Sequence, residues 1–234
     1  MPYTLAHPAI ILPLRRFSWL TFAGLFLGAM APDYEHVLRL NVVSTHSHTL
    51  PGLLYFCLPV GLLSVWLYRS TWSWVLADFF PQIKPGGVMI PFWKEALSVF
   101  IGACSHLFWD SFTHAGRWGV RMFPILNSEI DLHLSEPVFL WNFLQHFSSI
   151  LGLAILIVSF GAQAQRHSDD WIRRKLPRLL ALAFLIVVAA AAFTYLMRPG
   201  LTPKMVLVHT SNHFIAILAI VLTLWGAWRR REAS

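Results

Sequence analysis

Three polar side chains recur at four-residue intervals in the apolar stretch "GACSHLFWDSFTHAG", residues 102–116. In a helix, His106, Asp110 and His114 would lie on one side, about 40° apart, because an α-helix has 3.6 residues per turn. Imidazole and carboxylate groups are ligands of zinc and other borderline divalent metals. The stripe by itself predicts one wall of a polar site, which either forms hydrogen bonds between helices or holds a metal.

Further histidines and acids stand near the ends of other apolar segments. They are His7 in "TLAHPA", Asp33, Glu35 and His36 in "GAMAPDYEH", His46 and His48 in "STHSHTLPG", and His146 in "FLQHFSS". Ionisable groups in an apolar chain are usually functional, so their number favours a metal centre. We interpret His36 as a loop residue. Glu35 is a candidate general base, with a capping or solvated role as the alternative.

The composition predicts that a lipid bilayer surrounds the chain. Of its 234 residues, 56% are hydrophobic and only 12% are charged, against roughly 25% charged in an average soluble domain. The net charge of +7 comes from basic residues that stand between apolar segments, where membrane topology explains them and nucleic-acid binding is not needed. We infer no protein partner and a single membrane domain, residues 1–234.

The apolar runs predict an all-α integral membrane protein of about six transmembrane helices. Four runs are long enough to span unaided: 50–68, which we expect to kink near Pro59, 138–160, 179–197 and 205–228. The runs 17–32 and 96–112 are shorter, so the first and third spans are expected to be short. Residues 8–14 are too few to cross and predict a re-entrant or interfacial segment.

Basic residues orient these spans. Arginine and lysine crowd the loop at 161–178 and the segment 229–231, which places both on the cytoplasmic side. Six spans then put both termini in the cytoplasm. The same topology brings most of the histidines and acids to the outer side, so we expect the metal site near the outer face.

Several motifs together resemble a known family. "MPYTLAHPAIILPL", "GAMAPDYEHVLR", "SHTLPGLLYFCLPVGLL", "GACSHLFWDSFTH" and "FLQHFSSILGL" resemble the bacterial membrane family called domain of unknown function 4184. The likeness covers about residues 1–155, whereas 156–234, with the last two spans and the basic loop, is generic. This resemblance implies the bacterial cytoplasmic (inner) membrane.

A more distant resemblance concerns the order His, Pro-Asp, Thr-His-Ser and Ser-His-x3-Asp. It is similar to the YdjM-type membrane-bound metal-dependent hydrolases and to the all-helical fold of zinc-dependent phospholipase C and S1/P1 nuclease. The resemblance implies seven metal ligands: His7, Asp33, His48, His106, Asp110, His114 and His146, with His46 as the alternative to His48. The soluble phospholipases use a His-x3-Glu pair, and after His146 this chain has Ser149 and Ile150 instead.

The expected function is that of a metal-dependent hydrolase acting on a phosphoester of a lipid or lipid-linked substrate. One to three divalent ions, most readily Zn²⁺, would lower the pKa of bound water toward about 7, with Asp33 and Asp110 as catalytic, bridging carboxylates. Arg117 and Arg121 are candidates for holding the phosphate, or else are solvated loop charges beside lipid headgroups.

Two other functions stay open. A bound metal could serve only to hold helices together, or the polar groups could form the path of a transporter. An ion path should continue to the cytoplasmic side, yet the inner halves of the expected spans carry no ionisable residue. His209 and His213 share a helix face and either extend the site or form hydrogen bonds between helices.

Overall fold

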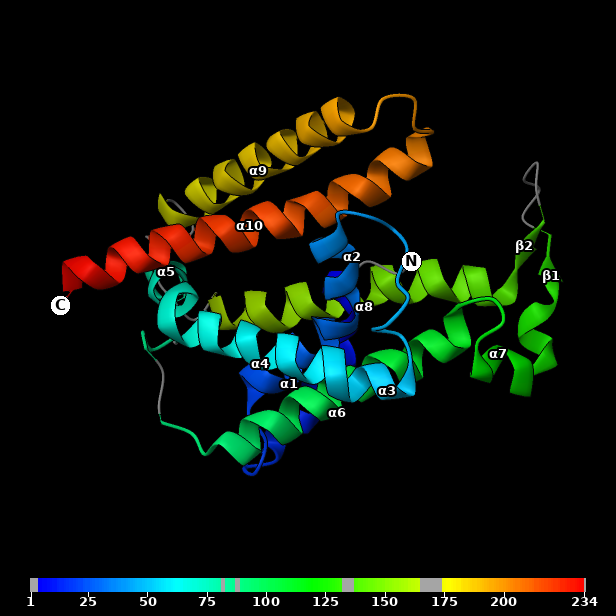
Figure 1. The fold of residues 1–234 in the computed structure, drawn as a ribbon, viewed down its shortest axis with the longest axis horizontal. Coiled ribbons are helices and arrows are strands. Elements are labelled where there is room, and N and C mark those ends of the chain that lie inside the picture. Colours follow the sequence, from blue (N-terminus) through cyan, green and yellow to red (C-terminus); the bar gives the residue numbers. More distant parts are fainter. Residues whose placement is uncertain (1–3, 81–82, 87–88, 132–136, 165–173, 234) are drawn as a thin grey trace.

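The computed structural model describes residues 4–80, 83–86, 89–131, 137–164 and 174–233, and it is nearly all helical (Figure 1). The elements in chain order are η1 (Thr4–Arg16), α1 (Phe22–Met30), η2 (Ala31–Asp33), α2 (Tyr34–Arg39), α3 (Leu50–Gly52), η3 (Leu53–Cys57), α4 (Leu58–Leu67), η4 (Tyr68–Trp72), α5 (Ser73–Phe79), α6 (Phe92–Thr113), α7 (Trp118–Met122), η5 (Pro124–Asn127), β1 (Glu129–Ile130), β2 (Val138–Phe139), α8 (Leu140–Ala164), α9 (Leu176–Met197) and α10 (Pro203–Ala233). The two strands form a short antiparallel pair, Glu129 opposite Phe139.

Four helices are long and apolar enough to cross a membrane: Leu50–Phe79, Leu140–Gly161, Leu176–Met197 and Met205–Ala233. The chain is therefore a membrane protein, but the expectation of six spans is not confirmed. The nine-residue α1 is only about 13 Å long, less than half of a hydrocarbon core of about 30 Å. Helix α6 has 22 residues but carries Lys94, Glu95, His106 and Asp110 and is not among the four.

The first of the four is continuous from α3 to α5, with two π-helical turns inside it. In η3 the hydrogen-bond ladder shifts, so that the N–H of Leu58 donates to the carbonyl of Leu53. Pro59 follows directly and has no N–H to donate. The irregularity expected at Pro59 is thus a π-turn just before it, a known way for a helix to absorb a proline.

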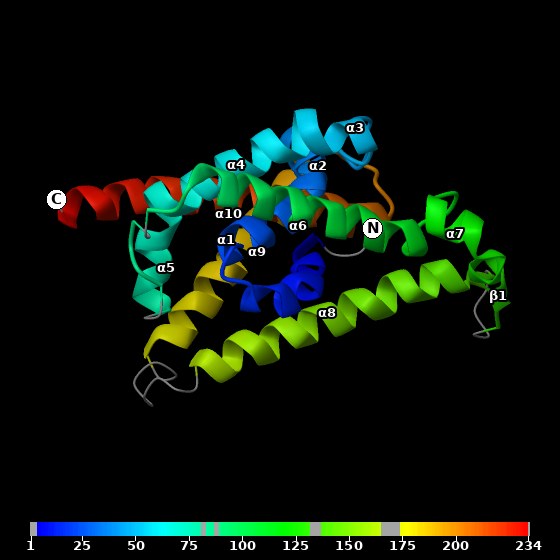
Figure 2. The same cartoon turned by 90° about the horizontal axis from the view of Figure 1, so that it is seen from below.

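The two N-terminal elements lie inside the molecule. Helix α1 packs against α6, η1 and α4, while η1 lies between α6 and α8 (Figure 2). Leu25 and Ala29 of α1 are fully buried and pack with Ile11 of η1. These short elements fill the interior that the long helices leave between them.

Glycines let α1 and α6 approach at backbone distance. A Cβ on Gly28 would lie 2.7 Å from the Cα of Val99, and a Cβ on Gly102 would lie 2.6 Å from the backbone N of Ala29. Small residues at such crossings are the usual means of packing helices in membranes, where burial of apolar surface gives little driving force. These contacts fix the position of α1 along the axis of α6.

The ends of the elements divide the molecule into two sides. The C-terminal end of α6 lies at the same side as α3, the start of α8 and the α9–α10 connection (Figure 1). At the opposite side are α5, the start of α6 and the C-terminal end of α10, where Arg229 forms an ion pair of 2.8 Å with Asp78. Much of the basic loop at 161–178 lies outside the described residues.

The α1–α6 contact predicts a strong difference between two glycine substitutions. Gly28→Ala should lower the free energy of unfolding by about 1–3 kcal/mol, because overpacking a close contact forces backbone shifts. Gly161→Ala is the control, since no atom lies within 4 Å of a Cβ placed there. Thermal unfolding in detergent measures both, and equal unfolding temperatures would contradict the close packing.

Candidate metal centre

Helix α6 presents His106 and Asp110 to the interior of the protein. His106 is fully buried and Asp110 is 4% exposed. The helix ends at Thr113, so His114 follows it with extended backbone angles instead of continuing the helical stripe. Its ring still turns back, with Nδ1 3.4 Å from Asp110 Oδ1. The three residues of the predicted stripe thus lie together, although the third is not helical.

Three other segments bring ligand-type side chains to the same place. Asp33 ends η2, the turn that follows α1, and His36 lies one turn later on α2. His7 comes from η1, and its ring stacks on that of His106 with centroids 3.6 Å apart. His48 comes from the loop before α3, and its Nε2 lies 3.5 Å from both Asp33 Oδ1 and Asp110 Oδ2.

Four of these atoms form a ring of alternating nitrogen and oxygen. The Nε2 atoms of His48 and His106 each lie 3.5–3.6 Å from Asp33 Oδ1 and Asp110 Oδ2. A charge-assisted hydrogen bond is shorter, about 2.7–2.9 Å. Ligand atoms about 2.0–2.1 Å from a tetrahedral zinc would be about 3.3 Å apart. The spacing therefore fits coordination better than direct hydrogen bonding.

The orientation of His106 supports the same conclusion. Its Nδ1 lies 2.8 Å from the carbonyl oxygen of Ala29, which can only accept, so Nδ1 carries a proton. In the neutral ring, Nε2 then directs a lone pair at two carboxylates, and it is buried with no hydrogen-bond partner among the described residues. A cation between these acceptors would stabilise the arrangement. A histidine whose other nitrogen is fixed by a carbonyl is a common metal ligand.

Asp110 is placed to bridge two positions. Its Oδ2 faces His48 and His106, while its Oδ1 lies 3.7 Å from His7 Nε2 and 3.4 Å from His114. Among the described residues, three overlapping groups have ligand atoms within 4.8 Å of one another: His7, Asp33 and His106; Asp33, His36 and His48; His48, His106 and Asp110. The donor set fits a divalent metal.

His36 is the member of the cluster that the sequence did not reveal. We interpreted it as a loop residue, but it is 3% exposed and its Nε2 lies 3.9 Å from Asp33 Oδ1. The spacing Asp33-x2-His36 places both on one face of a helical turn, and this i, i+3 relation was the available signal.

Glu35 does not face the cluster. Its carboxylate accepts hydrogen bonds from the backbone N–H groups of Thr45, His46 and Ser47, and it pairs with Arg39. Burial by itself raises the pKa of Glu35, but these N–H donors outweigh it and hold the pKa well below its usual range. The general-base interpretation of Glu35 is therefore not supported, and the carboxylate instead anchors the loop that carries His48.

Four further expected residues have distinct positions. His46 is exposed and bonds Tyr55 through Nδ1, so His48 is the member of the pair that reaches the cluster. Arg117 donates to the carbonyl of His48 at 2.9 Å, which supports the loop, whereas Arg121 is exposed. His146 is exposed and belongs to none of the groups of neighbouring ligand atoms found among the described residues.

Gln145 occupies the position toward the cluster that we expected for His146. It is 3% exposed, and its Nε2 lies 3.3 Å from His114 Nε2. His209 and His213 are buried on α10, where His213 Nδ1 lies 2.7 Å from the hydroxyl of Thr194 on α9. That contact corresponds to the expected hydrogen bonding between helices.

Comparison with known proteins gives one match. The family model described as "Domain of unknown function (DUF4184)" matches residues 1–227. The match extends past residue 155, where the recognised motifs ended, and includes the helices that we interpreted as generic. No curated protein and no solved structure matches the chain.

The two neighbouring histidines of the loop give a matched test of the metal centre. Purified wild-type protein should contain about one to three equivalents of zinc or a similar ion. His48→Ala should lose metal, since it removes a ligand, whereas His46→Ala should retain it because that ring faces Tyr55. Elemental analysis in detergent measures both, and equal metal content in wild type and His48→Ala would refute the assignment.

Replacing Glu35 tests its role as an anchor. Glu35→Gln should destabilise the protein, because the amide NH₂ meets N–H donors and each buried donor left unsatisfied costs about 1–3 kcal/mol. The lowered pKa means that the ionised carboxylate stabilises fully at neutral pH and that this contribution is lost only in acid. The loss of unfolding temperature should therefore be the same at pH 6 and pH 8; a loss that changes between these values would contradict it.

Proposed function

The chain belongs to the family described as Domain of unknown function (DUF4184), and we propose that it is a membrane-embedded, metal-dependent hydrolase. The observation that carries this proposal is the buried set of two aspartates and several histidines at coordination spacing. Its donors exceed what one closed tetrahedral ion requires, because Asp110 offers a separate oxygen to each of two histidine pairs. Zinc is the ion that this ligand set suits best.

The chemistry follows from the ligands. A divalent ion supplies a Lewis acid and lowers the pKa of a coordinated water. The residues of this chain hold and orient it: Ala29 fixes the ring of His106, and the hydroxyl of Thr4 donates to Asp33 Oδ2 at 2.6 Å. His114 has a side chain that is 22% exposed, against 6% or less for His7, His48 and His106. Substrate would approach at this edge.

A phosphoester of a lipid or lipid-linked molecule is the substrate class that the surroundings favour. The site lies among helices of membrane-spanning length, and Arg121 is an exposed cation seven residues beyond His114 that could meet a phosphate or a headgroup. Arg117 already donates to the carbonyl of His48, so it would act on the substrate only indirectly.

The membrane topology is also part of the proposal. Helix α6, at 22 residues about 33 Å long, would be a fifth crossing beside the four candidates, while η1 and α1 enter without crossing. The basic end of α10 would lie in the cytoplasm of a bacterial inner membrane and the cluster near the outer face. The expected cytoplasmic N-terminus agrees poorly with this arrangement, because Thr4 bonds Asp33 at the cluster.

Burial of the cluster favours a second candidate function, a metal that only stabilises the fold. Asp33, Asp110, His7 and His106 are all 4% exposed or less. A site closed by protein ligands on all positions is typical of structural zinc. The experiment must therefore separate catalysis from stabilisation.

A substrate screen with two matched aspartate variants makes that separation. Metal-loaded wild type in nanodiscs is offered phosphomonoester, phosphodiester and lipid-phosphate substrates, and hydrolysis should stop with chelator. Asp110→Asn should abolish activity, whereas Asp78→Asn makes the same change at an ion pair on the other side of the molecule and should leave activity intact. If the metal-loaded wild type hydrolyses nothing while chelator lowers its unfolding temperature, the structural role replaces the hydrolase.

A further inference from the structure

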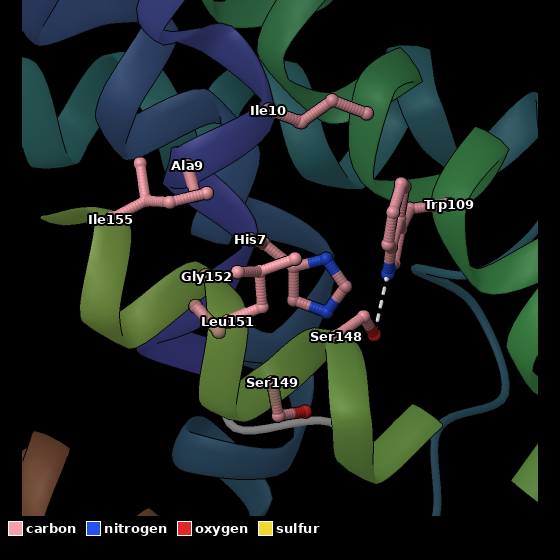
Figure 3. A pocket seen from close by; sticks show the side chains of 10 residues that line it. His7, Ala9, Ile10, Trp109, Ser148, Ser149, Leu151, Gly152 and Ile155 are labelled. Carbon is pink, nitrogen blue, oxygen red and sulfur yellow. Dashed lines mark hydrogen bonds between the residues drawn. The ribbon is translucent and has the colours of Figure 1, made fainter. Parts of the chain in front are cut away.

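An apolar cavity adjoins the cluster of histidines and aspartates at His7. Its volume is about 140 Å³, and it is open to the surface between η1 and α8 (Figure 3). The walls are mostly apolar and include Ala6, Ala9 and Ile10 from η1 and Leu151, Gly152 and Ile155 from α8. A Cβ on Gly152 would lie 2.9 Å from the carbonyl oxygen of Ala6, so η1 and α8 are in close contact at two residues that line the cavity.

The mouth of this cavity belongs to a face that lipid covers. Helix α8 is one of the candidate membrane spans. Leu151 is 48% exposed and Ile155 is 40% exposed, and Ile150, Ile157 and Val158 on the same helix are more exposed still. Exposed apolar side chains on a span face hydrocarbon, so the medium that enters such a cavity is the interior of the bilayer.

The inner end of the cavity is polar and reaches the cluster. His7 lines it (Figure 3), and the ring of His7 stacks on that of His106. Within the part of the chain that the structure describes, neither ring nitrogen of the buried His7 has a hydrogen-bond partner. Beside it, the indole N–H of Trp109 donates to Ser148 at 3.2 Å. An occupant would therefore have one apolar part among the walls and one polar part toward His7.

We propose that this cavity holds a single hydrocarbon chain of a membrane phospholipid, which brings the phosphate of that lipid to the cluster. The walls suit hydrocarbon and offer water few partners. A cavity of about 140 Å³ is too small for a helix of another protein. The role of this lipid as substrate rests on the proposed hydrolase function, whereas the occupancy of the cavity by a chain does not.

Photochemical labelling tests the occupant directly. The probe is a phosphatidylglycerol with a photoactivatable group in one acyl chain, in nanodiscs with the metal-loaded full-length protein. In wild type, labelling should concentrate on the peptides that contain residues 6–10 and 148–155, above the level on the lipid-exposed face of α9 at Phe184 and Leu185. Mass spectrometry of the digested protein locates and measures the adducts.

Two alanine variants make the test specific. Ala9→Phe fills the cavity and should reduce labelling there to the level measured on α9. Ala219→Phe makes the same change in a second apolar cavity, between α4 and α10, and should leave the labelling at η1 and α8 unchanged. Metal content equal to wild type in both variants shows that the cluster is intact. A variant that loses its metal is replaced by the smaller Ala9→Leu.

The outcomes separate this inference from the proposed hydrolase. Labelling needs no turnover, so cavity labelling that Ala9→Phe abolishes supports the chain site even if no substrate is hydrolysed. Wild-type labelling spread evenly over α8 and α9, or labelling unchanged by Ala9→Phe, overturns the chain site whether or not the protein is a hydrolase. If hydrolysis is found, Ala9→Phe should raise KM for a long-chain lipid phosphate and not for a water-soluble ester with the same headgroup.

Discussion

Two buried carboxylates that face histidine nitrogens are the constraint on which the rest of the structure depends. Asp33 and Asp110 are 2% and 4% exposed, and each of the ion pairs described for them joins a histidine. An uncompensated carboxylate in an apolar interior is very costly, and neutral imidazole does not compensate it. A divalent cation between these groups removes the cost. Binding of such a cation would then be coupled to folding.

The surrounding elements hold this cluster through backbone groups. The carbonyl of Ala29 orients His106, and it can do so because the glycines of α1 and α6 allow the two backbones to approach. The loop that carries His48 is fixed from both sides, by the carboxylate of Glu35 and by Arg117. These supports hold His106 and His48 with their Nε2 atoms toward the carboxylates of Asp33 and Asp110.

The membrane explains why the interior is built from short pieces. Long helices alone would leave a wide polar space, and lipid cannot satisfy polar groups there. The elements η1 and α1 occupy that space and are themselves covered by α4, α6 and α8. Irregular backbone at this depth is tolerated because protein surrounds it. The same arrangement leaves an apolar cavity along α8, and the ring of His7 lines it.

The long spans, the polar face of α6 and the family could be predicted from local features of the sequence alone. Apolar run length identified the four long spans, because crossing a bilayer sets a minimum length. The spacing of His106 and Asp110 identified the face of α6 that carries the cluster, and the motifs identified the family. The choice between adjacent residues could not be made in this way: His48 over His46, Gln145 over His146, and His36 as a member of the cluster. Side-chain direction at those positions depends on how loops and helices are rotated against their neighbours. The role of Glu35 was hidden for the same reason, since its partners lie ten to twelve residues away across a turn.

Only the tertiary structure decided that the first apolar run is a short helix inside the protein, because the glycine contacts that hold it join residues distant in the chain.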